Sequence, residues 1–119
     1  LEHLYNDFTL GSHSEVHVSH QQIPLTTAQH YIQTSQTKIQ NYFHQKTQFF
    51  RPPYGQRTPP LLNFLHQNQL YCMLWSIDSM DWYSQMTPDS TKNRVLALSL
   101  LKRKGIILFH DIQQKTATM

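Results

Sequence analysis

The chain has 119 residues and a mass of 14.1 kDa, a size that suits one compact domain. Hydrophobic residues make up 39% of it and charged residues only 14%, a globular composition that excludes a disordered chain. The net charge is +3, but the one basic cluster, residues 102–104, is interpreted as a solvated helix end rather than a nucleic-acid patch. No apolar run is long enough to span a membrane, no signal peptide is visible, and the lone Cys72 excludes an internal disulfide.

The first half of the sequence predicts a strand, a helix and a second strand. Residues 7–12 are expected to form a strand that ends at His13. Residues 26–43 are predicted to be helical, with Thr26 or Thr27 as the N-cap. The helix is expected to bury one apolar face made of Ala28, Tyr31, Ile32, Ile39, Tyr42 and Phe43. Residues 47–51 then form a short strand that is stopped by two prolines.

The second half continues the alternation. Residues 58–60 open a second helix, because proline fits the first helical turn. Residues 70–77 are predicted to be a fully buried strand, and residues 106–109 another continuous apolar strand. Between them a third helix is expected to run to Lys104 and to stop at Gly105. Its N-cap is expected to be one of three residues: Asp89, Ser90 or Thr91.

The resulting order is βαβαβαβ, and the apolar strands carry no clear polar alternation. Strands buried on both faces and separated by helices predict a parallel α/β sheet or barrel. Residues 113–119 contain no predicted closing element, and the chain begins with Leu1 rather than Met. We therefore expect the sequence to be an internal piece of a longer protein.

Polar and ionisable residues recur just after the predicted strands. They are His13, His17, Arg51, Tyr54, Asp78, Asp81, His110 and Asp111. The carboxyl ends of the strands of a parallel barrel converge on one face, where active sites are built. Four strands that each deliver such residues to one face therefore predict a functional site.

The histidine pair is the first candidate for chemistry. The spacing of His13 and His17 would place both imidazoles on one side of a helical turn, which suits zinc or a similar divalent ion. Two surface histidines are the alternative, and Glu15 does not complete a metalloprotease H-E-x-x-H pattern. A carboxylate ligand would have to come from elsewhere. The other three segments likewise have plain alternatives: a rigid turn, a polar turn and a helix-capping pair.

Four ordered segments resemble the polysaccharide deacetylase (NodB-homology) family of carbohydrate esterases. The family motifs H-[S/T]-x-x-H, R-x-P-Y-G, D-x-x-D-W and L-x-H-D are matched by residues 13–17, 51–55, 78–82 and 108–111. The matches occur in family order and cover most of the chain. They favour the metal-ligand interpretation of the two histidines.

The resemblance implies part of a distorted (β/α) barrel that removes N-acetyl or O-acetyl groups from a polysaccharide. It implies a divalent metal ion, with zinc first and cobalt, nickel or iron as alternatives, held by His13 and His17. The ion would polarise the acetyl carbonyl and activate water. The backbone N–H of Tyr54 would stabilise the oxyanion. Asp78 and Asp111 are expected to be structural.

The resemblance also assigns the proton-transfer and substrate residues. His110 would protonate the departing amine, and Asp81 would orient His110 and hold its charge. Arg51 would orient the general base. Trp82 and Leu108 would wall the pocket of the acetyl methyl group.

One family motif, T-F-D-D-G, is absent, and with it the general base and the third metal ligand. Asp7 lies too close to His13 to replace it. Residues 1–119 are therefore expected to be a partial catalytic domain, truncated at both ends. We expect this chain to be inactive and prone to association, and the complete protein to be a deacetylase.

Two other functions remain open. The first alternative is a catalytically inactive barrel that binds polysaccharide through Trp82, Tyr54 and Tyr83. The second is a hydrolase with a similar barrel that acts on a small amide. The expected partner is an acetylated polysaccharide, such as chitin oligomers, peptidoglycan, an acetylated glucosamine polymer or acetylated xylan, and not a nucleic acid. By resemblance, export to the cell envelope is expected.

Overall fold

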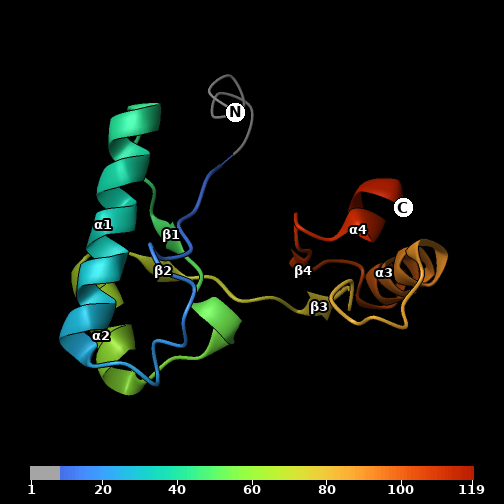
Figure 1. The fold of residues 1–119 in the computed structure, drawn as a ribbon, viewed down its shortest axis with the longest axis horizontal. Coiled ribbons are helices and arrows are strands. Elements are labelled where there is room, and N and C mark those ends of the chain that lie inside the picture. The colour runs from blue at the N-terminus through green and yellow to red at the C-terminus, as the bar shows by residue number, and fades with distance from the viewer. Residues whose placement is uncertain (1–8) are drawn as a thin grey trace. The chain divides into compact units, whose positions relative to one another are not determined.

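The computed structural model describes residues 9–119, which form two compact units divided between Leu74 and Trp75 (Figure 1). Part of the first predicted strand lies outside the described residues. Each unit has its own pair of parallel strands and its own helices, so each is described by itself. None of the helices in the described range is long and apolar enough to cross a membrane.

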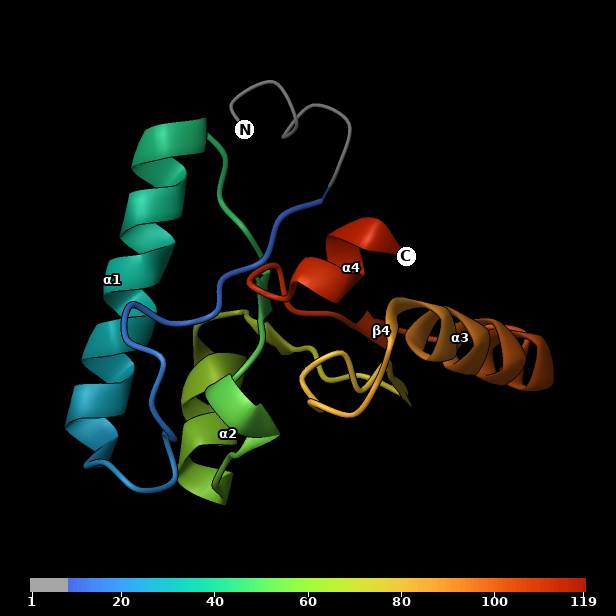
Figure 2. The same ribbon diagram turned by 45° about the vertical axis from the view of Figure 1, so that its right-hand side comes forward.

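The first unit packs two helices against a short parallel sheet. Its elements are α1 (Leu25–Phe43), β1 (Phe49–Phe50), the 3₁₀ helix η2 (Pro53–Gly55), α2 (Pro59–Gln67) and β2 (Tyr71–Cys72). Strand β1 pairs in parallel with β2, and α1 contacts α2 (Figure 2). The core is made of Ala28, Ile32, Phe50, Leu61, Leu65 and Leu70.

In the described part of the first predicted strand, residues 9–12, Ser12 forms one parallel bridge with Phe50. Ser12 N–H donates to Phe49 O, and Arg51 N–H donates to Ser12 O, both at 2.9 Å. Gly11 permits this close approach, because a Cβ at that position would lie 3.2 Å from the Cβ of Phe49. His13 therefore lies beside the end of β1, directly after the bridge.

Helix α1 ends at Phe43 as predicted, but it begins one residue earlier, at Leu25, and has a different N-cap. Its N-cap is Pro24 and not Thr26 or Thr27, because the Pro24 carbonyl accepts the first helical hydrogen bond, from Ala28. The predicted apolar face is only partly buried. Burial along the helix ends at Ser35, and Tyr42 near its end is 55% exposed.

Helix α2 begins as predicted. The Thr58 hydroxyl accepts a hydrogen bond from Leu61 N–H at 3.3 Å, and Pro59 occupies the first turn, where no N–H is needed.

The predicted single strand over residues 70–77 is wrong. The segment forms β2 in the first unit and β3 (Ile77–Asp78) in the second, and Tyr71 is 63% exposed. The β1–β2 ladder ends at Met73, because the next donor on the first strand would be Pro52, which has no N–H. The carbonyls of Met73 and Leu74 accept from the Arg51 guanidinium instead, at 3.2 and 3.3 Å.

The second unit contains β3, α3 (Pro88–Lys102), β4 (Ile107–Leu108) and α4 (Gln114–Thr118). Strands β3 and β4 are parallel, with Ile77 opposite Ile107. A capping box of Thr87 and Ser90 starts α3, so Ser90 takes part in the cap but is not the N-cap residue.

The C-terminal end of α3 and the last residues also differ from prediction. Arg103, with φ 62°, ends α3 in place of Gly105, and Lys102 donates to Ser76 O at 2.5 Å. Gly105 has a packing role instead, because a Cβ there would lie 2.7 Å from Ser76 Oγ. Residues 113–119 do contain a closing element, α4.

Candidate functional site

His13 and His17 lie together in the first unit, with ring centroids 5.0 Å apart and planes at 68°. They are brought together by a bend and not by the predicted helical turn. Ser14 has a left-handed backbone (φ 75°), which reverses the chain between the two rings. His13 Nδ1–H donates to the Arg51 carbonyl at 2.6 Å, an arrangement that leaves the lone pair on Nε2.

The loop that carries these histidines is held by His20, which is buried. His20 Nδ1–H donates to Val18 O, and His20 Nε2 accepts from the Ser14 hydroxyl, both at 2.9 Å. Burial lowers the pKa of His20; the hydrogen bond to Val18 opposes this, and His17 adds to the lowering. Sequence reasoning missed His20, although its place three residues after His17 was the available signal.

A second group of contacts ties the same loop to α1. Glu15 N–H donates to Tyr31 O at 3.3 Å, and the Glu15 carboxylate forms an ion pair with Lys38. The loop is therefore fixed by backbone and side-chain bonds on both sides of His17.

Tyr54 lies in η2 with φ 59° and ψ 9°, and its ring centroid is 4.7 Å from that of His17. Arg51 follows β1 directly and precedes η2. Its guanidinium binds the carbonyls of Met73 and Leu74, and burial lowers the pKa of the guanidinium. The structure thus places Arg51, Tyr54, His13 and His17 in one unit.

The histidine pair supplies part of a metal donor set. Two imidazoles suit zinc and similar divalent ions, and the Nδ1 bond of His13 is the kind of contact that orients a histidine ligand. Among the described residues, no group of three His, Cys, Asp or Glu side chains is close enough to hold an ion. The pair therefore fits a metal as two ligands of a larger set.

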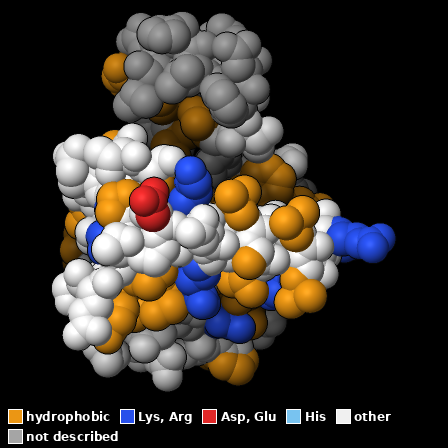
Figure 3. All heavy atoms as spheres, turned by 90° about the vertical axis from the view of Figure 1, so that its right-hand side faces the viewer, with side chains coloured by type: hydrophobic (Ala, Val, Ile, Leu, Met, Phe, Trp, Pro, Cys, Tyr) orange, Lys and Arg blue, Asp and Glu red, His pale blue; other side chains and the backbone are white. Residues whose placement is uncertain are grey.

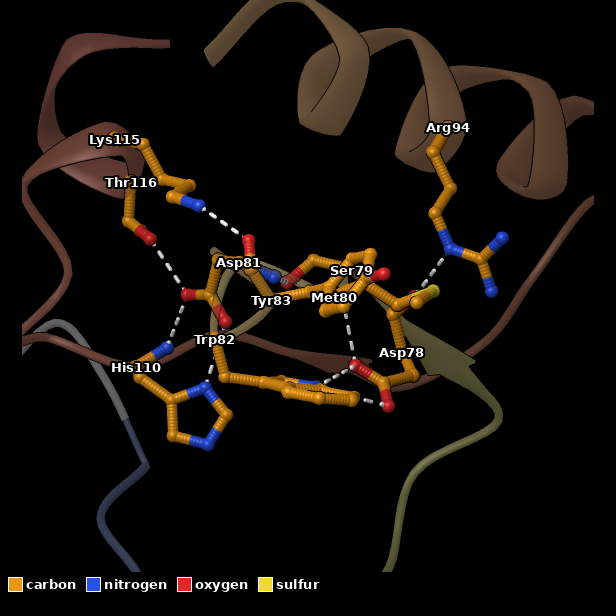
Figure 4. Close-up of polar contacts among 10 residues, drawn as sticks. All are labelled: Asp78, Ser79, Met80, Asp81, Trp82, Tyr83, Arg94, His110, Lys115 and Thr116. Atoms are coloured by element: carbon orange, nitrogen blue, oxygen red, sulfur yellow. Dashed lines mark hydrogen bonds and ion pairs between the residues drawn. The ribbon is translucent and has the colours of Figure 1, made fainter. Parts of the chain in front are cut away.

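The second unit holds Asp81 and His110. Asp81 is fully buried (0% exposed), and its Oδ1 accepts from His110 Nδ1–H at 2.7 Å (Figure 4). Its Oδ2 accepts from His110 N–H and from the Thr116 hydroxyl, both at 2.6 Å. Burial by itself raises the pKa of Asp81, but the bonds from Thr116 and then His110 outweigh it, and the pKa is lowered. A buried, ionised carboxylate thus faces an imidazole whose Nε2 points away from it.

The other expected residues surround this pair. The Asp78 carboxylate accepts from Met80 N–H at 2.9 Å and from Trp82 Nε1–H at 3.2 Å. Trp82 is 50% exposed, and Leu108 is half-buried in β4 opposite Asp78. Sequence reasoning missed Thr116, because no pattern pointed from residues 113–119 to Asp81.

Comparison with known proteins places the chain in a family. The family model described as polysaccharide deacetylase matches residues 2–73. Chitin deacetylase 1 of Saccharomyces cerevisiae is 32% identical over 72 residues, which cover 57% of this chain and 24% of that protein. The chain thus spans about a quarter of the curated relative it matches.

Solved structures share the fold. A family 4 carbohydrate esterase from Streptomyces lividans has a TM-score of 0.83 at 26% identity, covering 97% of this chain and 58% of that one. Peptidoglycan deacetylase PdaC from Bacillus subtilis has a TM-score of 0.72 at 26% identity (88% and 49%). A family 4 pseudoenzyme from Bacillus anthracis, at 23% identity and TM-score 0.76 (91% and 37%), is similar in fold alone. The expected fold class, part of a distorted (β/α) barrel with parallel strands, is confirmed.

Proposed function

Because the chain belongs to the polysaccharide deacetylase family, we propose that it is part of the catalytic domain of an enzyme that removes acetyl groups, N-acetyl first, from a polysaccharide. The observation that carries this proposal is the pair of Asp81 and His110, in which a buried carboxylate holds an imidazole at 2.7 Å. Such a pair suits general acid catalysis at near-neutral pH.

In the first unit, His13 and His17 would hold a divalent metal ion, with zinc first and cobalt, nickel or iron as alternatives. When bound, the ion would supply Lewis-acid polarisation of the acetyl carbonyl and a water of lowered pKa. His13 is prepared for this role by its bond to Arg51 O, which keeps the lone pair on Nε2. The remaining ligand would be a carboxylate of a T-F-D-D-G motif, which the 119 residues do not contain.

Tyr54 and Arg51 would support the same reaction. The Tyr54 N–H is a preorganised backbone donor in a tight turn, and we assign it to the developing oxyanion. Arg51 would orient the general base, since its guanidinium is fixed by two carbonyls.

In the second unit, His110 would give its proton to the departing amine nitrogen. Asp81 keeps the ring oriented through Nδ1, so that Nε2 is the proton-transferring atom. Trp82, held by Asp78, and Leu108 would wall the pocket of the acetyl methyl group. The two-ligand metal set and the missing base lead us to propose that the 119 residues alone release no acetate.

The substrate would be a polysaccharide that carries N-acetyl groups. Chitin is named for the yeast relative and peptidoglycan for the Bacillus subtilis structure, so we propose a cell-wall polymer of this kind. An enzyme with such a substrate would act outside the cytoplasm.

A polysaccharide-binding module without catalysis is the second candidate. Residues 9–119 hold no group of three metal-binding side chains, and this fold also occurs in a protein described as a pseudoenzyme. Trp82, Tyr54 and Tyr83 are exposed aromatic rings that would contact sugars.

The test is acetate release from N-acetylglucosamine oligomers and from peptidoglycan by the zinc-loaded complete protein. We expect His110→Asn to lower kcat by a factor of about 10²–10⁴, and His13→Ala to abolish stoichiometric zinc binding. His66→Asn, on the exposed end of α2, is the matched control. Sugar binding without acetate release by the complete protein would favour the binding module instead.

A further inference from the structure

Helix α4 contacts the turn that carries Asp81 through two neighbouring side chains (Figure 4). The Thr116 hydroxyl donates to Asp81 Oδ2 at 2.6 Å. Lys115 Nζ donates to the carbonyls of Tyr83 and Met86, both at 2.7 Å. A five-residue helix would be marginal by itself, so these bonds to the 81–86 turn and the packing of α4 against α3 hold it in place.

The Asp81 carboxylate takes three hydrogen bonds from other residues, and two of the donors belong to His110. The third donor is Thr116, which reaches Oδ2 from a different element. A buried carboxylate oxygen that loses a donor pays a desolvation cost, and it becomes free to rotate toward other partners. Thr116 is therefore the one of these donors that does not belong to His110, and it shares Oδ2 with the His110 backbone N–H.

We propose that Thr116 is a positioning residue, which fixes the Asp81 carboxylate so that His110 keeps the ring orientation needed for proton transfer, and that Lys115 holds α4 in place for this purpose. The inference rests on the proposed role of His110 in deacetylation. Under this inference, helix α4 is a functional part of the site around His110.

Removal of the hydroxyl has a defined electrostatic consequence. A donor to the ionised form lowers a pKa, so Thr116→Val raises the pKa of Asp81 toward its ordinary value. The ionisable groups on the elements around Asp81 include His110 at the end of β4, Lys115 on α4, Asp78 at the end of β3, and Arg94 of α3, which donates to Asp78 O. None of these four is changed by the substitution.

The experiment is a pH titration of the full chain with ¹³C-labelled aspartate, with the Asp81 carboxyl carbon as the probe. We expect the Asp81 midpoint to rise in Thr116→Val and to return in Thr116→Ser, which restores the hydroxyl. Thr118→Val is the matched control, because the Thr118 hydroxyl bonds only to Gln114 O and Lys115 O within α4. An Asp81 midpoint that is equal in Thr116→Val and Thr118→Val would overturn the proposal.

A measurement on the unsubstituted chain covers the case in which valine prevents folding. A hydroxyl proton bonded to a buried carboxylate exchanges slowly with water, so a Thr116 hydroxyl resonance is expected above the acid transition of Asp81 and is lost below it. The absence of that resonance at neutral pH would equally overturn the proposal.

Activity separates this inference from the proposed function. In the complete protein, Thr116→Val is expected to lower kcat on the order of tenfold with KM unchanged, part of the contribution of the general acid. If the complete protein releases no acetate but the Asp81 midpoint still rises in Thr116→Val, the proposed deacetylase function is wrong and the Thr116–Asp81 hydrogen bond is supported. If the complete protein releases acetate and the Thr116→Val and Thr118→Val variants have the same kcat and the same Asp81 midpoint, the role of Thr116 is wrong and the deacetylase function stands.

Discussion

The two units position their histidines with different kinds of partner. In the first unit, His13 and His20 each bond through Nδ1 to a backbone carbonyl, and neither bond brings a negative charge to the ring. In the second unit, His110 bonds to the carboxylate of Asp81. A metal ligand must offer a lone pair, whereas an acid must hold a proton that it can release. The choice of partner thus matches the different roles proposed for the same residue type.

The interiors of the two units also differ in the kind of residue that they bury. The first unit has a continuous apolar core around Phe50 and Leu61. In the second unit, the buried residues include Ser79, Asp81 and Thr91 beside Ile77 and Val95. Leucines on α3 remain exposed, and Figure 3 shows hydrophobic and basic side chains interspersed on one face of the molecule. We therefore expect the first unit to depend on packing and the second on its polar contacts.

The largest effect is expected from Phe50→Ala, which opens a cavity in the apolar core of the first unit. A fully buried phenylalanine contributes about 3–5 kcal/mol to the free energy of unfolding when compared with alanine. Urea unfolding followed by far-UV circular dichroism measures the loss. Tyr42→Ala, at an exposed position of α1, is the control, and an equal loss in both variants would contradict a packed core around Phe50.

Asp81→Asn tests the polar interior of the second unit. At pH 7 we expect a loss of about 2 kcal/mol in unfolding free energy, because a buried carboxylate that accepts from a backbone N–H, an imidazole N–H and a hydroxyl is replaced by an amide. The pKa of Asp81 is lowered on folding, so its contribution is present above the unfolded value of about 3.9 and is lost as the pH falls through the folded value. Urea unfolding at pH 7 and pH 3 should show the difference between the two proteins shrinking in acid. A difference that does not change with pH would contradict an ionised Asp81.

His20→Phe tests the neutral histidine of the first unit. At pH 8 the variant is expected to lose about 1–2 kcal/mol, because the Ser14 hydroxyl and Val18 carbonyl lose their partner. The folded pKa of His20 is lowered, so its stabilising contribution is present above about pH 6.5 and is lost as the pH falls through the folded value. The variant should therefore lose less stability than the parent chain between pH 8 and pH 5. His66→Phe, on the exposed end of α2, should leave the acid sensitivity intact.

The smallest effects are expected at the helix caps, where the two units use the same device. Thr58→Ala at α2 and Thr87→Ala at α3 each remove a hydroxyl that accepts from the first helical turn. Each should cost about 1 kcal/mol in urea unfolding, while Thr→Ser at either position should cost much less. A cost at only one of the caps would show that local capping does not act alike in the two units.

The parts of this structure that could be predicted are those that depend on residues close together in the sequence. Thr58 with Pro59 marks the start of α2, and the Phe49–Phe50 strand and the polar residues after it follow from short-range pattern. The four motif segments were sufficient to indicate the family, because their order and spacing are features of the sequence itself.

Tertiary contacts decided the rest. Strand β2 ends at Cys72, and the next two carbonyls, of Met73 and Leu74, accept from the Arg51 guanidinium, which is 22 and 23 residues away in the sequence. His20 is buried with both ring nitrogens bonded, and Thr116 reaches Asp81 from 35 residues away. Sequence by itself determined which residue types stand at the strand ends and the order in which they occur. Which of them acquire a carbonyl, a hydroxyl or a carboxylate as partner was decided only by folding, because a hydrogen bond needs two groups within about 3 Å, and chain order does not set that distance.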